Sequence, residues 1–213
     1  MAYPELAGPY GFKPTNLIGG QYSTGAFRQI PIASGNTTSI FNGDIVDIDS
    51  NGLLIKSTAT VGTTAASGVG VFIGCAYTDP NLKYFIQKQY YPAGTAATDI
   101  VGYVIDDPNQ LFKAAVTADT TTTLGYVLRT AVGENATIVQ NVGTSATDTG
   151  NSANSILQTT SASTATFPMR IIDVVPETSY QFLNATPAYE TRYREVIIKW
   201  NQDAHRYQNS TGI

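Results

Sequence analysis

The chain is short of charge and of the side chains on which most catalytic sites depend. Only 13% of its 213 residues are charged, and it contains a single Cys and a single His, whereas an ordinary soluble domain carries about a quarter charged residues. One Cys and one His cannot assemble a zinc cluster, an iron–sulfur site or a CxxC redox motif within one copy. We therefore expect no metal site, no cofactor and no enzyme activity.

Basic residues and long apolar runs are also scarce. Twelve Lys and Arg stand against sixteen Asp and Glu, for a net charge of −4, whereas nucleic-acid binding requires clustered cations. No stretch approaches the roughly 18 apolar residues of a membrane span. The N-terminus, Met1–Glu5, lacks the basic region and apolar stretch of a signal peptide. These features argue against nucleic acid and membrane as partners.

Residues 1–39 combine frequent Pro and Gly, which prevent long helices and strands, with scattered aromatic side chains. A disordered tail rarely keeps so many aromatic residues. We therefore interpret this segment as an extended N-terminal arm that anchors on another surface, and the alternative is a loop-rich cap over the protein's own core. The aromatic residues expected to contact a partner from this arm are Tyr3, Tyr10, Phe12, Tyr22 and Phe27.

Residues 40–213 are expected to form a single β-rich domain. The alternation at 43–49, followed by Asn51-Gly52 and the apolar run 53–58, predicts a hairpin with a type I′ turn. Val196, Ile198 and Trp200 share one face of the last predicted strand. The fold class is therefore all-β, a single β-barrel or β-sandwich-like domain with an extended N-terminal arm and long loops. Further strands are predicted at 70–77, 82–91, 99–105, 124–132, 136–142, 167–175 and 194–200, and a short helical turn at 107–112.

No candidate catalytic site stands out from a structural explanation. His205 lies in a polar C-terminal stretch and is interpreted as a surface or interface residue. The pair Asp106 and Asp107 suggests acid–base chemistry, but Asp107 followed by Pro108 is better explained as a helix cap. The aromatic group at residues 84–91 suggests a stacking platform for sugars or bases, or a protein interface, where Tyr is enriched. From this group we expect Tyr84, Tyr90 and Tyr91 to contact a partner.

Several stretches resemble one family. They include GVGVFIGCAYTDP at 68–80, QKQYYPAGTAAT at 87–98, VGYVIDDPNQLF at 101–112, TDTGNSAN at 147–154 and FPMRIIDVV at 167–175. Together with the opening GPYGFKP at 8–14, these stretches resemble capsid decoration (cement) proteins of tailed bacteriophages, particularly marine phages. The resemblance implies a β-rich structural protein on the outer capsid surface of the virion, made in the host cytoplasm. Such a protein is often a homotrimer, binds the major capsid protein and has no catalytic residues.

The leading hypothesis is therefore a virion structural protein that decorates and stabilises a phage capsid by binding the major capsid protein at symmetry-related sites. The alternatives are another virion component, such as a head–tail or tail-fibre protein, and a carbohydrate-binding β-sandwich that uses exposed Tyr side chains. All three use contact surfaces rather than chemistry.

Overall fold

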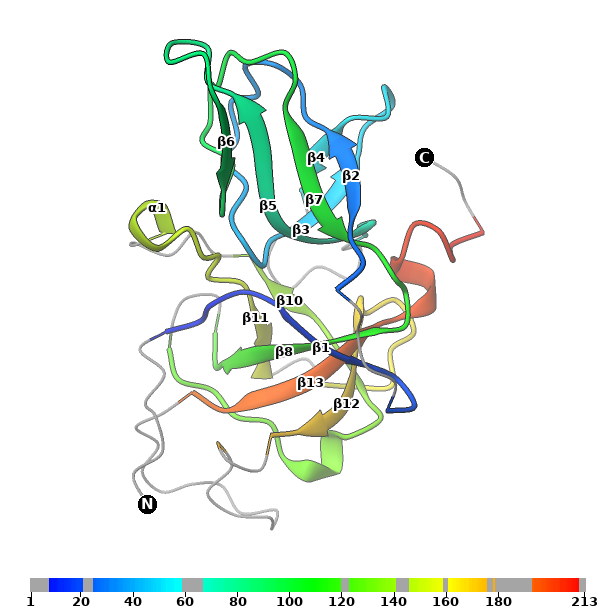
Figure 1. Cartoon of the computed structure of the whole chain (residues 1–213). Helices are drawn as coiled ribbons and strands as arrows, with labels where there is room; N and C mark the ends of the chain where they lie inside the picture. The colour runs from blue at the N-terminus through cyan, green and yellow to red at the C-terminus, as the bar shows by residue number, and fades with distance from the viewer. Residues whose placement is uncertain are drawn as a thin grey trace.

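The computed structural model describes residues 8–20, 25–58, 67–119, 123–140, 146–158, 161–175, 178 and 193–210. Nearly all regular structure in this part of the chain is β-strand, arranged as two sheets, one above the other in Figure 1. The helical elements described are short turns, namely α1 (Ala146–Thr149) and the 3₁₀ turns Arg129–Ala131 and Gln202–Ala204. The prediction of an all-β fold is confirmed.

The lower sheet in Figure 1 closes on itself, and we call it the barrel. Its hydrogen-bonded order is β10-β11-β8-β13-β12-β9, with β1 paired to β8. The strands at the two ends of this order, β9 and β10, are separated only by Thr137, so one segment pairs with both β12 and β11. This closes the sheet into a barrel. The barrel strands are β1 (Lys13–Leu17), β8 (Gln110–Thr117), β9 (Asn135–Ala136), β10 (Ile138–Val139), β11 (Ser155–Leu157), β12 (Met169–Val174) and β13 (Glu195–Trp200).

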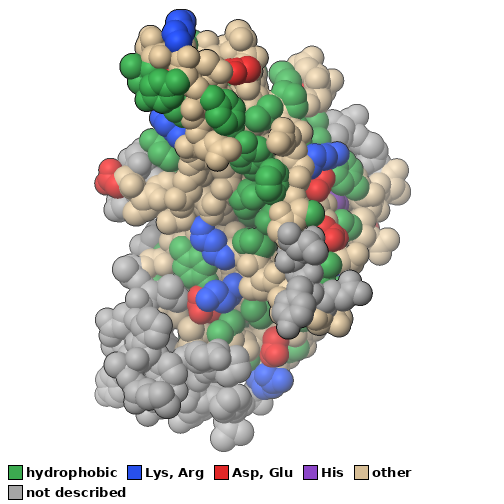
Figure 2. All heavy atoms as spheres, in the orientation of Figure 1, with side chains coloured by type: hydrophobic (Ala, Val, Ile, Leu, Met, Phe, Trp, Pro, Cys, Tyr) green, Lys and Arg blue, Asp and Glu red, His purple; other side chains and the backbone are tan. Residues whose placement is uncertain are grey.

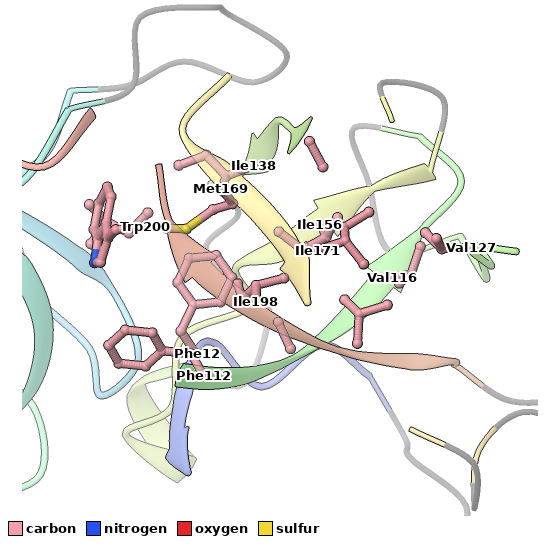
Figure 3. Close-up of a cluster of buried hydrophobic side chains, with 14 of the residues drawn as sticks. Phe12, Phe112, Val116, Val127, Ile138, Ile156, Met169, Ile171, Ile198 and Trp200 are labelled. Atoms are coloured by element: carbon pink, nitrogen blue, oxygen red, sulfur yellow. The ribbon is translucent and has the colours of Figure 1, made fainter. Parts of the chain in front are cut away.

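Alternate residues of the barrel strands fill its interior. On β13, Val196, Ile198 and Trp200 are buried in one apolar cluster, whereas Lys199 is only half-buried, so the predicted core face of this strand is confirmed. Figure 3 shows side chains from several strands, including Phe112 and Ile198, converging on this cluster. Because strand side chains alternate between faces, this core is a direct result of the sequence pattern.

The upper sheet in Figure 1 curls around a second apolar cluster. Its order is β2-β7-β5-β3-β4, and β6 pairs with β5. A Cβ atom added to Gly102 on β7 would lie 2.5 Å from Leu54 Cδ2 on β4, although two strands separate them in the sheet. The sheet therefore has a concave inner side that faces its own core. Its strands are β2 (Arg28–Pro31), β3 (Ile45–Ile48), β4 (Leu54–Lys56), β5 (Gly70–Thr78), β6 (Phe85–Lys88) and β7 (Val101–Ile105).

The hairpin predicted around Asn51-Gly52 is present as β3 and β4, but its turn differs from the prediction. A type I′ turn requires positive φ at both central residues, and here Gly52 has φ +78° whereas Asn51 is not in that region. The Gly52 amide donates to the Asp49 carbonyl, and the Asp49 carboxylate accepts from the Asn51 and Leu53 amides. The Asp49 side chain thus supports a longer turn that needs only one left-handed residue.

The two sheets share one junction. Gly11 and Gly43 have φ of +80° and +93°, and the Phe12 amide donates to the Gly43 carbonyl at 3.1 Å. Ile45 and Val71 of the upper sheet belong to the same buried cluster as Phe12 and the barrel residues. The barrel and the upper sheet are therefore packed against each other through a continuous apolar core.

The described part of residues 1–39 does not extend away from the body. Strand β1 pairs with β8 of the barrel, and β2 pairs with β7 of the upper sheet. In these two described strands the segment predicted as a separate arm is therefore paired with the sheets of the domain predicted for 40–213. The sequence does not predict β1 and β2, because Pro and Gly obscure any alternation there and both strands pair with segments about 70 to 100 residues away along the chain.

Two further local predictions were wrong. Residues 107–112 form no helical turn, because the Asp107 carboxylate accepts from the Asn109 amide in a tight turn and β8 starts at Gln110. Residues 124–132 form no strand, and the 3₁₀ turn Arg129–Ala131 lies there instead. In both places the hydrogen bonds that form the turn are local, from the Gln110 amide to the Asp107 carbonyl and from the Ala131 amide to the Leu128 carbonyl.

The junction predicts the effect of a single methyl group. A Cβ atom at Gly11 would lie 2.9 Å from Gly43 Cα and from Ser152 Cβ. We expect Gly11→Ala to lower the free energy of unfolding by about 2 to 4 kcal/mol, from left-handed strain and overpacking together. Gly52→Ala is the control, because Gly52 has a similar φ but no atom within 4 Å of the added Cβ. Urea denaturation should show a clearly smaller decrease in the free energy of unfolding for Gly52→Ala than for Gly11→Ala. Equal decreases would contradict the steric role of the junction.

Candidate protein-binding surface

The eight aromatic residues predicted to contact a partner occupy very different places. Tyr3 and Tyr22 lie outside the described residues. Phe12 and Tyr91 are fully buried, Phe12 in the barrel core and Tyr91 in the core of the upper sheet. The prediction that these two rings contact a partner is therefore wrong for this structure, because the protein's own core already covers them.

Tyr10 and Tyr90 are half-buried and already engaged within the chain. The Tyr10 hydroxyl donates to the Glu195 carboxylate, which also pairs with Lys113 at 3.2 Å. Burial, followed by this hydrogen bond and the charge of Glu195, raises the pKa of Tyr10 above its usual range. Tyr90 stacks on Phe41 with a distance of 5.4 Å between ring centroids. Both rings mainly hold neighbouring segments together.

Phe27 and Tyr84 are exposed, by 49% and 54% respectively. Phe27 precedes β2 and packs edge-on against Tyr103 of β7, with ring centroids 4.9 Å apart. Tyr84 immediately precedes β6. Phe27 lies beside the upper sheet, and Tyr84 lies in the hairpin of β5 and β6. Both are next to a surface whose members follow from the strand register.

The side of the upper sheet that faces away from its core forms a surface that we call the outer face. In β5, Phe72 and Cys75 face the core of the upper sheet. Between them, Ile73 and Gly74 form a bulge, an extra residue that shifts the pairing with β7. Residues paired across antiparallel strands point to the same side, so the register fixes the members of the outer face. They are Phe27, Gln29, Pro31, Ile73, Gly74, Ala76, Thr78, Phe85, Gln87, Val101 and Tyr103.

None of the residues of the outer face is charged. Figure 2 shows apolar side chains gathered over this part of the molecule, on the side that faces the reader in Figure 1. Phe85 is 62% exposed, and Ile73, Val101 and Tyr103 are partly exposed. Gly74 and Ala76 are buried, so the exposed part of the face is made by its other members. Exposed apolar side chains without charge are typical of a protein interface rather than of a solvated sheet.

The turn between β5 and β6 extends the outer face with further apolar side chains. The Asp79 carboxylate accepts from the Asn81 and Leu82 amides, and these hydrogen bonds lower the pKa of Asp79. Lys83 has φ +59°, and its amide donates to the Asp79 carbonyl. This bonded turn presents Leu82, which is 62% exposed, beside Tyr84 and Phe85. A turn whose backbone is already held by hydrogen bonds loses less entropy on association than a flexible loop.

The groups considered for chemistry do not converge. Asp106 pairs with Arg28 at 2.9 Å, whereas the Asp107 carboxylate accepts from a backbone amide. Burial raises the pKa of the Cys75 thiol to about 12, so this sulfur is protonated and unreactive at neutral pH. Within the described residues no three His, Cys, Asp or Glu side chains form a group that could hold a metal ion. No helix of the described chain is long and apolar enough to span a membrane.

The sequence did not identify the largest part of the outer face. Phe85 was considered only as one of an aromatic group, and Ile73, Val101 and Tyr103 were interpreted simply as strand residues. The run Gly70–Thr78 is apolar on both sides, so periodicity could not show which side is covered. The available signal was the absence of charge in two strands of the face, Gly70–Thr78 and Val101–Ile105.

Comparisons with known proteins add no identification. No family model matches the chain, and neither the curated proteins nor the solved structures contain a match.

The corrected positions of the aromatic residues can be tested by stability measurements. We expect Tyr91→Ala to lower the free energy of unfolding by about 3 to 5 kcal/mol, because a fully buried ring leaves a cavity. Tyr84→Ala should change it by no more than about 0.5 kcal/mol, because that ring is exposed. Thermal or urea denaturation of the two variants measures this difference. Similar decreases in the free energy of unfolding would contradict the burial of Tyr91 and the exposure of Tyr84.

Proposed function

We propose that this protein is a structural component of a virus particle that decorates and stabilises a phage capsid. Its partners are the major capsid protein and further copies of itself, arranged as a trimer on the outer capsid surface. The observation that carries the proposal is the uncharged outer face of β2, β7, β5 and β6, continued by the bonded turn at Asp79–Tyr84.

The chemistry of the outer face suits a protein present in many copies. A surface without charge can approach an identical copy without like-charge repulsion, and it can be covered by another protein without leaving a buried charge unpaired. Each contact can be weak, because a trimer multiplies capsid contacts through effective concentration. This argument supports a contact function, while the resemblance of the sequence to decoration proteins supports the particular assignment.

The stretches that carry the resemblance coincide with the outer face to a large extent. Residues 68–80 contain β5, and residues 101–112 contain β7 and the start of β8. Residues 87–98 begin at the end of β6 and include buried residues of the core of the upper sheet. Three of the stretches that carry the resemblance therefore contribute residues to the surface that we assign to partner binding.

Copy number in the purified particle tests the proposed function. We expect quantitative mass spectrometry to find as many copies as a set of symmetry-related sites over the whole shell requires, in fixed ratio to the major capsid protein. A few copies per particle would instead indicate a head–tail or tail-fibre component. Absence from the particle would contradict any virion role.

Charge placed on the outer face tests the assigned surface. Gln29→Lys with Gln87→Lys adds two cations on exposed side chains of this face, so folding should be retained. We expect binding to capsids that lack the protein to weaken at least about tenfold, because these cations lose solvation at the interface without a partner. Thr37→Lys with Ser163→Lys is the matched control, with the same added charge on exposed residues elsewhere. Equal binding by both variants would remove the outer face from the interface.

The carbohydrate-binding alternative is narrowed by the structure. Of the Tyr residues at 84–91, Tyr91 is buried and Tyr90 is stacked on Phe41, whereas Tyr84 is exposed. A glycan array with wild type and Tyr84→Ala distinguishes this function, because specific binding that is lost in the variant would favour it over capsid binding.

A further inference from the structure

The C-terminal segment Asn201–Ser210 connects the two sheets after the chain leaves the barrel. It follows β13 directly, and Figure 1 shows it beside the lower end of the upper sheet. Gly68, just before β5, pairs with this segment: the Gly68 amide donates to the Ala204 carbonyl at 3.2 Å, and the Arg206 amide donates to the Gly68 carbonyl at 3.1 Å. The segment therefore acts as a clasp across the junction.

The only histidine of the chain lies at the centre of this segment, contrary to the surface position expected from the sequence. His205 is fully buried and packs edge-on against Trp200 and Tyr207, with ring centroids 5.7 and 5.6 Å away. Its Nδ1 accepts a long hydrogen bond of 3.4 Å from the Tyr207 amide. Its Nε2, like Trp200 Nε1, is buried without a hydrogen-bond partner. This is an environment for a neutral ring.

Charged groups approach His205 from several elements, and most are paired with one another. Asp106 and Asp107 come from the β7–β8 connection, and both favour the cationic ring. Arg28 of β2 pairs with Asp106 at 2.9 Å and stacks over Tyr207 at 4.8 Å. On the clasp itself, Arg206 binds both carboxylate oxygens of Asp47 of β3, at 2.7 to 3.1 Å. Burial lowers the pKa of His205 and outweighs the backbone groups of Asp106 and Val69 and the charges of Asp106 and Asp107, all of which raise it.

From this geometry we infer that the segment Asn201–Ser210 is an acid-sensitive latch between the barrel and the upper sheet, opened by a proton on His205. The proton would bind at Nδ1, which now accepts a hydrogen bond from the Tyr207 amide. The two N–H groups would then face each other, and this hydrogen bond would be lost. The new cation would also be buried, which is costly. The ring leaves the core to regain water, and Trp200 becomes uncovered.

Linkage fixes the direction and the size of the effect. In the open segment the pKa of His205 returns to its ordinary value of 6.5, and in the closed segment it is lower. The closed latch is therefore fully stable above that value and weakens as the pH falls below it. One titrating group changes the equilibrium by at most about tenfold per pH unit. The range down to about pH 5 lies above that in which ordinary carboxyl groups titrate.

The chain supplies its own probe, because it contains one Trp and one His in direct contact. Between pH 7 and about pH 5 we expect the emission of Trp200 to shift to longer wavelength. Amide exchange in residues 201–210, corrected for its intrinsic pH dependence, should rise by up to about tenfold per pH unit. His205→Gln should show neither change over this range. An emission that does not move, or that moves equally in His205→Gln, would overturn the latch.

A second pair of variants keeps the test decisive if His205→Gln does not fold. Arg206→Gln removes the ion pair to Asp47 and weakens the clasp, so the transition of Trp200 should move to higher pH. Arg129→Gln is the control, because it removes an ion pair with Asp173 that lies on the exposed barrel surface. Identical transitions in both variants would show that the clasp does not govern Trp200. The purified chain suffices for these measurements, so their outcome is separate from capsid binding.

Discussion

The close approach of two backbones at Gly11 and Gly43 is the constraint on which the rest of the structure depends. Both residues adopt left-handed conformations, and a Cβ atom on either one would lie less than 3 Å from the other chain segment. This approach lets Phe12 enter the barrel core beside Ile45 and Val71 of the upper sheet. Two sheets that are each too small to bury both of their sides are thereby joined into one body.

Joining the sheets in this way determines which surfaces stay exposed. The concave side of the upper sheet is covered by its own loops, including the segment around Ile40 and Tyr91, which pair by two backbone hydrogen bonds. The lower end of the opposite side meets the barrel through Val71 and Ile105. The remainder of that side is the outer face, so its exposure is a consequence of the architecture. Among the described residues, none that the strand register places on this face is charged, and the Asp99 carboxylate accepts from Thr78 at its edge.

Buried ionic groups fix the position of segments at the junction. Asp44 is fully buried, accepts from the Phe41 amide and pairs with Lys56 at 2.8 Å. Asp47 on the same strand holds Arg206 of the C-terminal segment. Such pairs add little net stability, but removing one partner leaves an uncompensated buried charge. They therefore specify one arrangement of the strands.

The sequence by itself determined the strand character of the chain and several core faces. Alternation is a local property, so Val196, Ile198 and Trp200 could be placed on one side of a strand, and the hairpin at Asn51-Gly52 could be located, without any tertiary information. Only the tertiary structure decided which aromatic rings are buried. The neighbours Tyr90 and Tyr91 are alike in sequence, yet only Tyr91 is fully buried. The same holds for β1, β2 and the outer face, because pairing and burial depend on segments far away along the chain.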